Sequence, residues 1–171
     1  MCVDESGFYL LPMAVSTYAP VGQTPILQVK LTHDHLSAIG GITAQGRIFM
    51  QVQDHSYKGP DVVRFLQLLL REIPGKTLVI WDGASIHRGQ AVKDFLKKGG
   101  AKRIHLERFP GYAPELNPQE GVWNLLKRVE LKNVCCLDLQ HVEQELLHAK
   151  ERLRHHKSTL SQCYAHAGYQ L

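Results

Sequence analysis

The chain has 171 residues, of which 44% are hydrophobic and 21% charged, and its formal net charge at pH 7 is +4. This length fits one domain that buries a hydrophobic core, and the composition is that of an ordinary globular protein. No stretch reaches the apolar length of a membrane span, and residues 1–5 lack a signal-peptide pattern, which leaves a cytoplasmic location as the expectation.

The first third of the chain lacks a helical period and predicts extended segments. These strands are expected at residues 3–11, 14–18, 36–43 and 47–53. Pro12 ends the first of them, and Ala44-Gln45-Gly46 between the last two indicates a hairpin. We therefore expect the fold to open with antiparallel strands.

The rest of the chain alternates helices with short strands. Helices are expected at residues 60–73, 90–98, 118–131 and 139–156, and strands at residues 78–81 and 103–109. The run Leu78-Val79-Ile80-Trp81 is continuously apolar, as in a strand that is buried on both faces. Helices between later strands imply right-handed crossovers and parallel pairing. The predicted fold class is α/β, a mixed sheet covered by helices with further helices at the C-terminal end.

Three acidic residues lie where the predicted chain stays in the sheet or stops beside it. Asp4 lies in the first strand, Asp82 ends the strand at residues 78–81, and Glu120 lies in the first turn of a helix. If the first strand and the strand at residues 78–81 are neighbours, these carboxylates converge. Clustered carboxylates repel one another, and their hard oxygen atoms suit Mg²⁺ or Mn²⁺. Two such ions roughly 4 Å apart catalyse phosphoryl transfer.

Each carboxylate also has a structural interpretation that the residues alone leave open. Asp4 fits an ordinary edge-strand carboxylate, and the neighbouring Glu5 faces the opposite side of the sheet, so only one of them can serve the site. Asp82 followed by glycine fits a turn. Glu120 fits a capping box with Asn117 as the N-cap residue.

Three sequence blocks resemble the signature blocks of Tc/mariner-superfamily transposases, and in particular those of bacterial insertion sequences. They are Val3-Asp4-Glu5-Ser6-Gly7-Phe8, Val79-Ile80-Trp81-Asp82-Gly83-Ala84-Ser85-Ile86-His87 and Tyr112-Ala113-Pro114-Glu115-Leu116-Asn117-Pro118-Gln119-Glu120-Gly121-Val122-Trp123. The blocks stand in family order, and the resemblance covers nearly the whole chain, as one catalytic domain over residues 1–171.

The resemblance implies an RNase H-like fold in which Asp4, Asp82 and Glu120 are catalytic and bind two divalent cations, Mg²⁺ or Mn²⁺. It implies DNA transposition: water attacks phosphodiesters at the transposon ends, and the freed 3′-hydroxyl then attacks target DNA without a covalent protein–DNA intermediate. The implied partners are transposon-end and target DNA, and a homodimer or an assembly with an N-terminal DNA-binding polypeptide. The implied location is the bacterial cytosol, at the nucleoid when bound to DNA.

Five basic side chains are candidates for DNA contact: His87, Arg88, Lys127, Arg128 and Lys132. Helical spacing sets Lys127 on the face that carries Glu120. His87 matches the family histidine five residues after the second aspartate, where it contacts phosphate or steadies the metal site; an ordinary hydrogen-bonded loop histidine is the alternative. For the others the alternative is a solvated surface charge. Glu115 ranks below Glu120 because the family has a non-catalytic acid there.

Two departures from the family pattern affect the expected activity. No helix-turn-helix region precedes Met1, and only three residues precede Asp4 in the first strand, where other members carry more apolar residues. The alternative function is therefore a truncated, inactive remnant that binds DNA or pairs with a transposase. A hydrolytic nuclease on the same scaffold is a third possibility. The four cysteines lack metal or disulfide spacing and are expected to be reduced.

Overall fold

The computed structural model describes residues 1–29 and 31–170. Its centre is a five-stranded sheet in the order β3-β2-β1-β4-β5. The strands are β1 (Cys2–Tyr9), β2 (His35–Ile42), β3 (Ile48–Gln53), β4 (Thr77–Trp81) and β5 (Ile104–Arg108). The first three strands are antiparallel, whereas β1, β4 and β5 run parallel. The predicted mixed sheet is confirmed, with the N-terminal strand at its centre.

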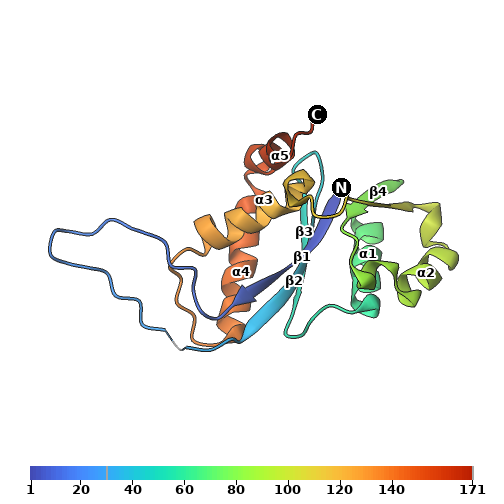
Figure 1. The fold of residues 1–171 in the computed structure, drawn as a ribbon. Helices are drawn as coiled ribbons and strands as arrows, with labels where there is room; N and C mark the ends of the chain where they lie inside the picture. Colours follow the sequence, from blue (N-terminus) through green and yellow to red (C-terminus); the bar gives the residue numbers. More distant parts are fainter. Residues whose placement is uncertain (30, 171) are drawn as a thin grey trace.

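Helices cover both faces of this sheet, with α1 and α4 on opposite sides of β1–β3 (Figure 1). The helices are α1 (Gly59–Glu72), α2 (Gln90–Lys97), α3 (Pro118–Leu125), α4 (Leu139–Arg154) and α5 (Lys157–His166). Short 3₁₀ turns lie at η1 (Ser85–Arg88), η2 (Gly100–Lys102) and η3 (Pro114–Leu116). Among the described residues no helix is long and apolar enough to cross a bilayer. All four cysteines are free thiols, as expected.

The alternation of side chains along β1 divides it between two hydrophobic cores. Cys2 and Phe8 are buried in the core formed with α3, α4 and α5, whereas Val3 is buried in the core formed with α1. Since successive side chains of a strand point to opposite faces, Asp4 lies on the α3 side and Glu5 on the α1 side. This one-residue difference determines the partners of both carboxylates.

The strand predicted at residues 14–18 is absent, and that prediction was wrong. The described residues between β1 and β2 contain no helix or strand, and they form a long arm that projects away from the sheet (blue, Figure 1). The base of the arm is held instead by Asn133, whose backbone amide donates to the Met13 carbonyl at 3.1 Å. The Asn133 side chain accepts a hydrogen bond from the Val15 amide at 2.8 Å and donates one to the Val15 carbonyl at 3.0 Å. No neighbouring strand lies there to pair with the segment.

The C-terminal helices differ from the prediction in two ways. The helix expected at residues 139–156 ends at Arg154, and the sequence analysis missed α5, which follows it. The helix expected at residues 118–131 is present, but its last turn, Leu126–Glu130, is a π-helix, in which the Leu131 amide donates to the Leu126 carbonyl. This wider turn rotates the later side chains. A regular helical period continued from Val122 and Leu126 would bury Val129, which is instead 53% exposed.

Strand β4 is not buried on both faces as predicted. Val79 and Trp81 are buried on the α1 side, but Leu78 on the other face is 45% exposed. The reason is that α3 and α4 contact β1, β2 and β3 on that face and leave β4 and β5 uncovered. The sheet surface beside β4 consequently stays open to solvent next to Asp4.

Candidate active site

The pairing of β1 with β4 brings the first two candidate carboxylates together. Cys2 pairs with Ile80 in the parallel register, and the Ile80 amide donates to the Met1 carbonyl at 2.9 Å. Continuing this register by two residues sets Asp4 beside Asp82, which directly follows β4. The convergence expected for Asp4 and Asp82 required β1 and β4 to be neighbours, and the two strands are neighbours.

Asp4 is held from the α3 side by a tryptophan. The indole N–H of Trp123 donates to Asp4 Oδ2 at 3.0 Å, and Trp123 is only 2% exposed. This close approach of α3 depends on Gly40, the β2 residue that pairs with Asp4. A Cβ atom at Gly40 would lie 2.5 Å from the Trp123 ring and 2.7 Å from Gln119 Nε2. The sequence analysis missed Gly40; its only signal was a glycine within a strand pattern.

Glu120 lies on the exposed side of the first turn of α3, close to Asp4. Asn117 is the N-cap residue, as predicted, and accepts from the Gln119 amide at 3.1 Å. The Asn117 amide donates to the Pro114 carbonyl, so the capping-box role proposed for the Glu120 carboxylate is not realised. Burial, followed by the charges of Glu120 and Glu5, raises the pKa of Asp4 from 3.8 to about 7, against the Trp123 hydrogen bond. The carboxylates of Asp4 and Glu120 therefore lack a positive charge that fully compensates them.

The Asp82 carboxylate is engaged by the turn that follows it. Its Oδ1 accepts from the Ala84 amide at 2.9 Å and lies 2.8 Å from His87 Nδ1. The other nitrogen, His87 Nε2, lies 3.0 Å from Glu5 Oε1. Burial lowers the pKa of His87, but the hydrogen bond and charge of Glu5, with those of Asp82, outweigh it and raise the pKa above 6.5.

Asp4 and Glu120 are thus neighbours, and the strand register aligns Asp82 with Asp4, but the three carboxylates do not form a closed ligand set among the described residues. Among residues 1–29 and 31–170, no three His, Cys, Asp or Glu side chains are arranged to hold a metal ion. Asp4 and Glu120 interact on the α3 side, whereas Asp82 is turned toward His87. The donor chemistry nevertheless suits a hard divalent cation, since all three side chains offer carboxylate oxygens. In addition to burial, the negative charges of Glu120 and Glu5 repel the Asp4 carboxylate and raise its pKa, and a bound cation would offset this repulsion.

Lys127 is the predicted DNA-binding residue that lies on the side of Asp4 and Glu120. Its ammonium donates to Ser6 Oγ at 2.7 Å and lies 5.2 Å from the centroid of the Phe8 ring. Burial lowers the pKa of Lys127, and the charges of Glu120 and Asp4 oppose that change. The prediction that Lys127 projects on the side of Glu120 is confirmed.

The remaining candidates for DNA contact differ in accessibility. Arg88, Arg128 and Lys132 are exposed, on η1, on the π-turn after α3 and just beyond it. His87 is only 4% exposed, and its ring stacks on Trp81 with centroids 4.2 Å apart. The contacts of His87 with Asp82 and Glu5 fit either a residue that steadies the site or the alternative, an ordinary hydrogen-bonded loop histidine.

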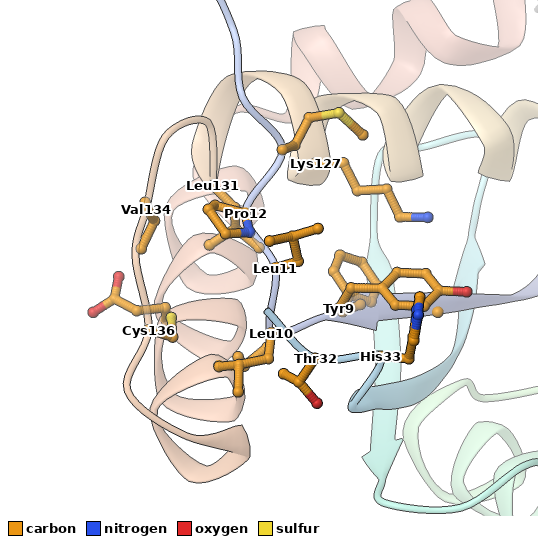
Figure 2. A pocket seen from close by; sticks show the side chains of 15 residues that line it. Tyr9, Leu10, Leu11, Pro12, Thr32, His33, Lys127, Leu131, Val134 and Cys136 are labelled. Atoms are coloured by element: carbon orange, nitrogen blue, oxygen red, sulfur yellow. The ribbon is translucent and has the colours of Figure 1, made fainter. Parts of the chain in front are cut away.

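An apolar pocket of about 340 Å³ lies at the other end of β1, beside the base of the arm (Figure 2). Tyr9, Leu10 and Leu11 line it together with Leu131 and residues of α4 and the preceding loop. Lys127 borders this pocket as well as the acidic group, but none of the three candidate carboxylates lines it. This apolar pocket is therefore separate from the candidate carboxylates.

Comparison with known proteins decides the family. The family model for the DDE superfamily endonucleases matches residues 1–143. The chain belongs to this family. A comparison with curated proteins gives no match for this DDE endonuclease.

Solved structures of the mariner transposase Mos1 share the fold of this DDE endonuclease. The Mos1 strand transfer complex matches with a TM-score of 0.66 and 16% identity, over 99% of this chain and 55% of that chain. The Mos1 paired-end complex with Mn matches with a TM-score of 0.63, 15% identity, and 99% and 56% coverage. The Mos1 catalytic domain matches with a TM-score of 0.59, 13% identity, and 99% and 82% coverage. The chain spans about half the length of the first two, and its fold is RNase H-like.

Proposed function

We propose that this DDE endonuclease is the catalytic domain of a transposase, of the bacterial insertion-sequence type, that cleaves and joins DNA strands. The observation that supports the proposal is the parallel pairing of β1 with β4, whose register aligns Asp4 with Asp82, together with the charge interaction between Asp4 and Glu120. Family membership and the RNase H-like fold support it. The Mos1 structures that share this fold include a strand transfer complex and a paired-end complex with the left transposon end, which support DNA as the partner.

Asp4, Asp82 and Glu120 would hold two divalent cations, Mg²⁺ or Mn²⁺. Such ions, when bound, activate the attacking oxygen and stabilise the leaving oxygen of a phosphodiester. The protein itself holds the metal-binding and DNA-binding side chains in position. Trp123 fixes Asp4, and the basic side chains Lys127 and Arg128 lie on the following turns of the same helix, where they would bind DNA phosphates.

DNA contacts are also proposed at Arg88 and Lys132. His87, which is buried, is proposed to contribute to DNA binding through its hydrogen bonds to the acidic residues. Arg88 lies on η1, six residues after Asp82, whereas Lys132 follows the π-turn at the far end of the helix that carries Glu120. The whole assembly is proposed to be a dimer or a complex with an N-terminal DNA-binding polypeptide.

The experiment is a plasmid assay with the 171-residue chain, alone and with its DNA-binding partner, in Mn²⁺ and in Mg²⁺. We expect metal-dependent nicking, and joining of an oligonucleotide 3′-hydroxyl end to the plasmid. Asp82→Asn should abolish both reactions with an unchanged circular dichroism spectrum, whereas the exposed Glu115→Gln should retain both. Activity that survives in Asp82→Asn would refute the catalytic triad, and nicking without joining would identify a hydrolytic nuclease.

A second candidate function is a non-catalytic remnant that binds DNA or pairs with a transposase. The observation that favours it is the engagement of Asp82 by His87, which leaves the described residues without a closed three-ligand group. Titration with Mn²⁺ separates the two functions. A catalytic domain binds Mn²⁺ in a manner that Asp82→Asn weakens, whereas a remnant of this kind shows no binding that depends on Asp82.

A further inference from the structure

Glu5 is the acidic residue next to Asp4 that the catalytic proposal does not use. It lies on the opposite face of β1 from Asp4, on the side of α1. Its carboxylate is nevertheless tied to the candidate site, because Glu5 Oε1 lies 3.0 Å from His87 Nε2. A carboxylate oxygen accepts hydrogen bonds, so Nε2 is the donor in this contact.

The histidine that receives this contact is enclosed and has a fixed orientation. The ring is 4% exposed and stacks on Trp81, with an angle of 4° between the two planes. Its second nitrogen, Nδ1, donates to the backbone carbonyl of Asp82 at 3.3 Å and lies 2.8 Å from Asp82 Oδ1. Glu5 therefore fixes one end of an imidazole whose other end holds Asp82.

We propose that Glu5 is a positioning residue, which acts from the opposite face of the sheet and sets the orientation of the Asp82 carboxylate through His87. The inference rests on the proposed function of Asp82 as a metal ligand. The described hydrogen bonds and ion pairs of the Asp82 side chain use only Oδ1, which binds the Ala84 amide and His87. The remaining oxygen is left for a cation. Partners behind a ligand commonly fix its orientation, and their removal weakens metal affinity by roughly 10–100-fold.

The alternative is that the contact between Glu5 and His87 only ties β1 to the turn after β4. Such a tie would contribute to stability without affecting where the Asp82 carboxylate points. The Ala84 amide distinguishes the two roles, since its hydrogen bond to Asp82 Oδ1 reports the carboxylate position in the absence of metal.

The experiment compares the chain with Glu5→Ala, Glu5→Gln and Asp54→Asn. Asp54→Asn is the matched control, because Asp54 also contacts a histidine, at 2.9 Å, but on the surface. In metal-free protein, amide NMR should show the Ala84 proton shifted and exchanging about tenfold faster with solvent in Glu5→Ala. Glu5→Gln, which keeps an acceptor oxygen, should restore most of the protection, and Asp54→Asn should match the parent chain.

A Mn²⁺ titration followed by electron paramagnetic resonance completes the test. We expect about tenfold weaker binding in Glu5→Ala and near-parental binding in Glu5→Gln. An unchanged Ala84 signal in Glu5→Ala overturns the positioning role, whatever its thermal stability, and so does unchanged affinity in a chain that binds Mn²⁺. If the parent chain binds no Mn²⁺ while the Ala84 signal changes as expected, the catalytic function fails and the positioning contact stands.

Discussion

The charge on Asp4 should destabilise the metal-free protein, and Asp4→Asn should remove that cost. The pKa of Asp4 is raised from 3.8 to about 7, so the folded state retains a proton that the unfolded state has lost in this range. The resulting stability is fully present below pH 3.8 and is lost as the pH rises through 7. At 1.36 kcal/mol per unit, the shift corresponds to about 4 kcal/mol. Asp4 keeps some solvent contact, and screening reduces the expected gain to about 2 kcal/mol.

The assay is urea unfolding of the parent chain and Asp4→Asn in EDTA, from pH 4 to pH 8. Asparagine has nearly the same shape and can still accept the Trp123 hydrogen bond, so the comparison isolates the charge. We expect the two proteins to have similar free energies of unfolding near pH 4 and Asp4→Asn to be more stable by about 2 kcal/mol at pH 8. Glu143→Gln, at an exposed position of α4, is the control. A stability difference that does not change with pH would refute the electrostatic reasoning.

Three further predictions concern packing and protonation. Gly40→Ala should cost about 2 kcal/mol in urea unfolding, because its Cβ would overlap the indole ring of α3. Gly7→Ala, whose Cβ meets its nearest neighbour at 3.5 Å, should change stability by less than about 0.5 kcal/mol. Leu146→Ala, at a fully buried position, should cost about 2–5 kcal/mol in the same assay. NMR titration should give His87 a pKa above 6.5 that falls in Glu5→Gln; an unaltered midpoint would contradict the role of the Glu5 charge.

The parts of the fold that periodicity controls were predictable from the sequence. The hairpin of β2 and β3, the helix that starts near Pro60 and the strand before Asp82 all follow from local patterns of apolar residues. The segment at residues 14–18 has a similar extended pattern but pairs with no strand, because β-structure depends on partners that a local pattern does not specify. The exposure of Val129 does not follow from a helical pattern for a related reason, since a π-turn changes the period that this pattern assumes.

The candidate site was predictable at the level of residues but not of contacts. The proximity of Asp4 and Glu120, and the pairing of β1 with β4, agree with the prediction. The two residues that support these acids were not assigned that role. Gly40 matters only because α3 crosses it, and Glu5 matters only because His87 folds back beneath the sheet. Both relations join residues far apart in the sequence, so spacing carries no signal for them.

The central place of β1 in the sheet has a consequence for the speed of folding. Both neighbours of β1 are distant from it in sequence, since β2 begins at residue 35 and β4 at residue 77. Pairings between such distant segments require large loops to close before any stabilising contact forms, which slows folding. The β1–β2 pair closes the smaller loop, so the pairing of β1 with β4 is expected to form later during folding.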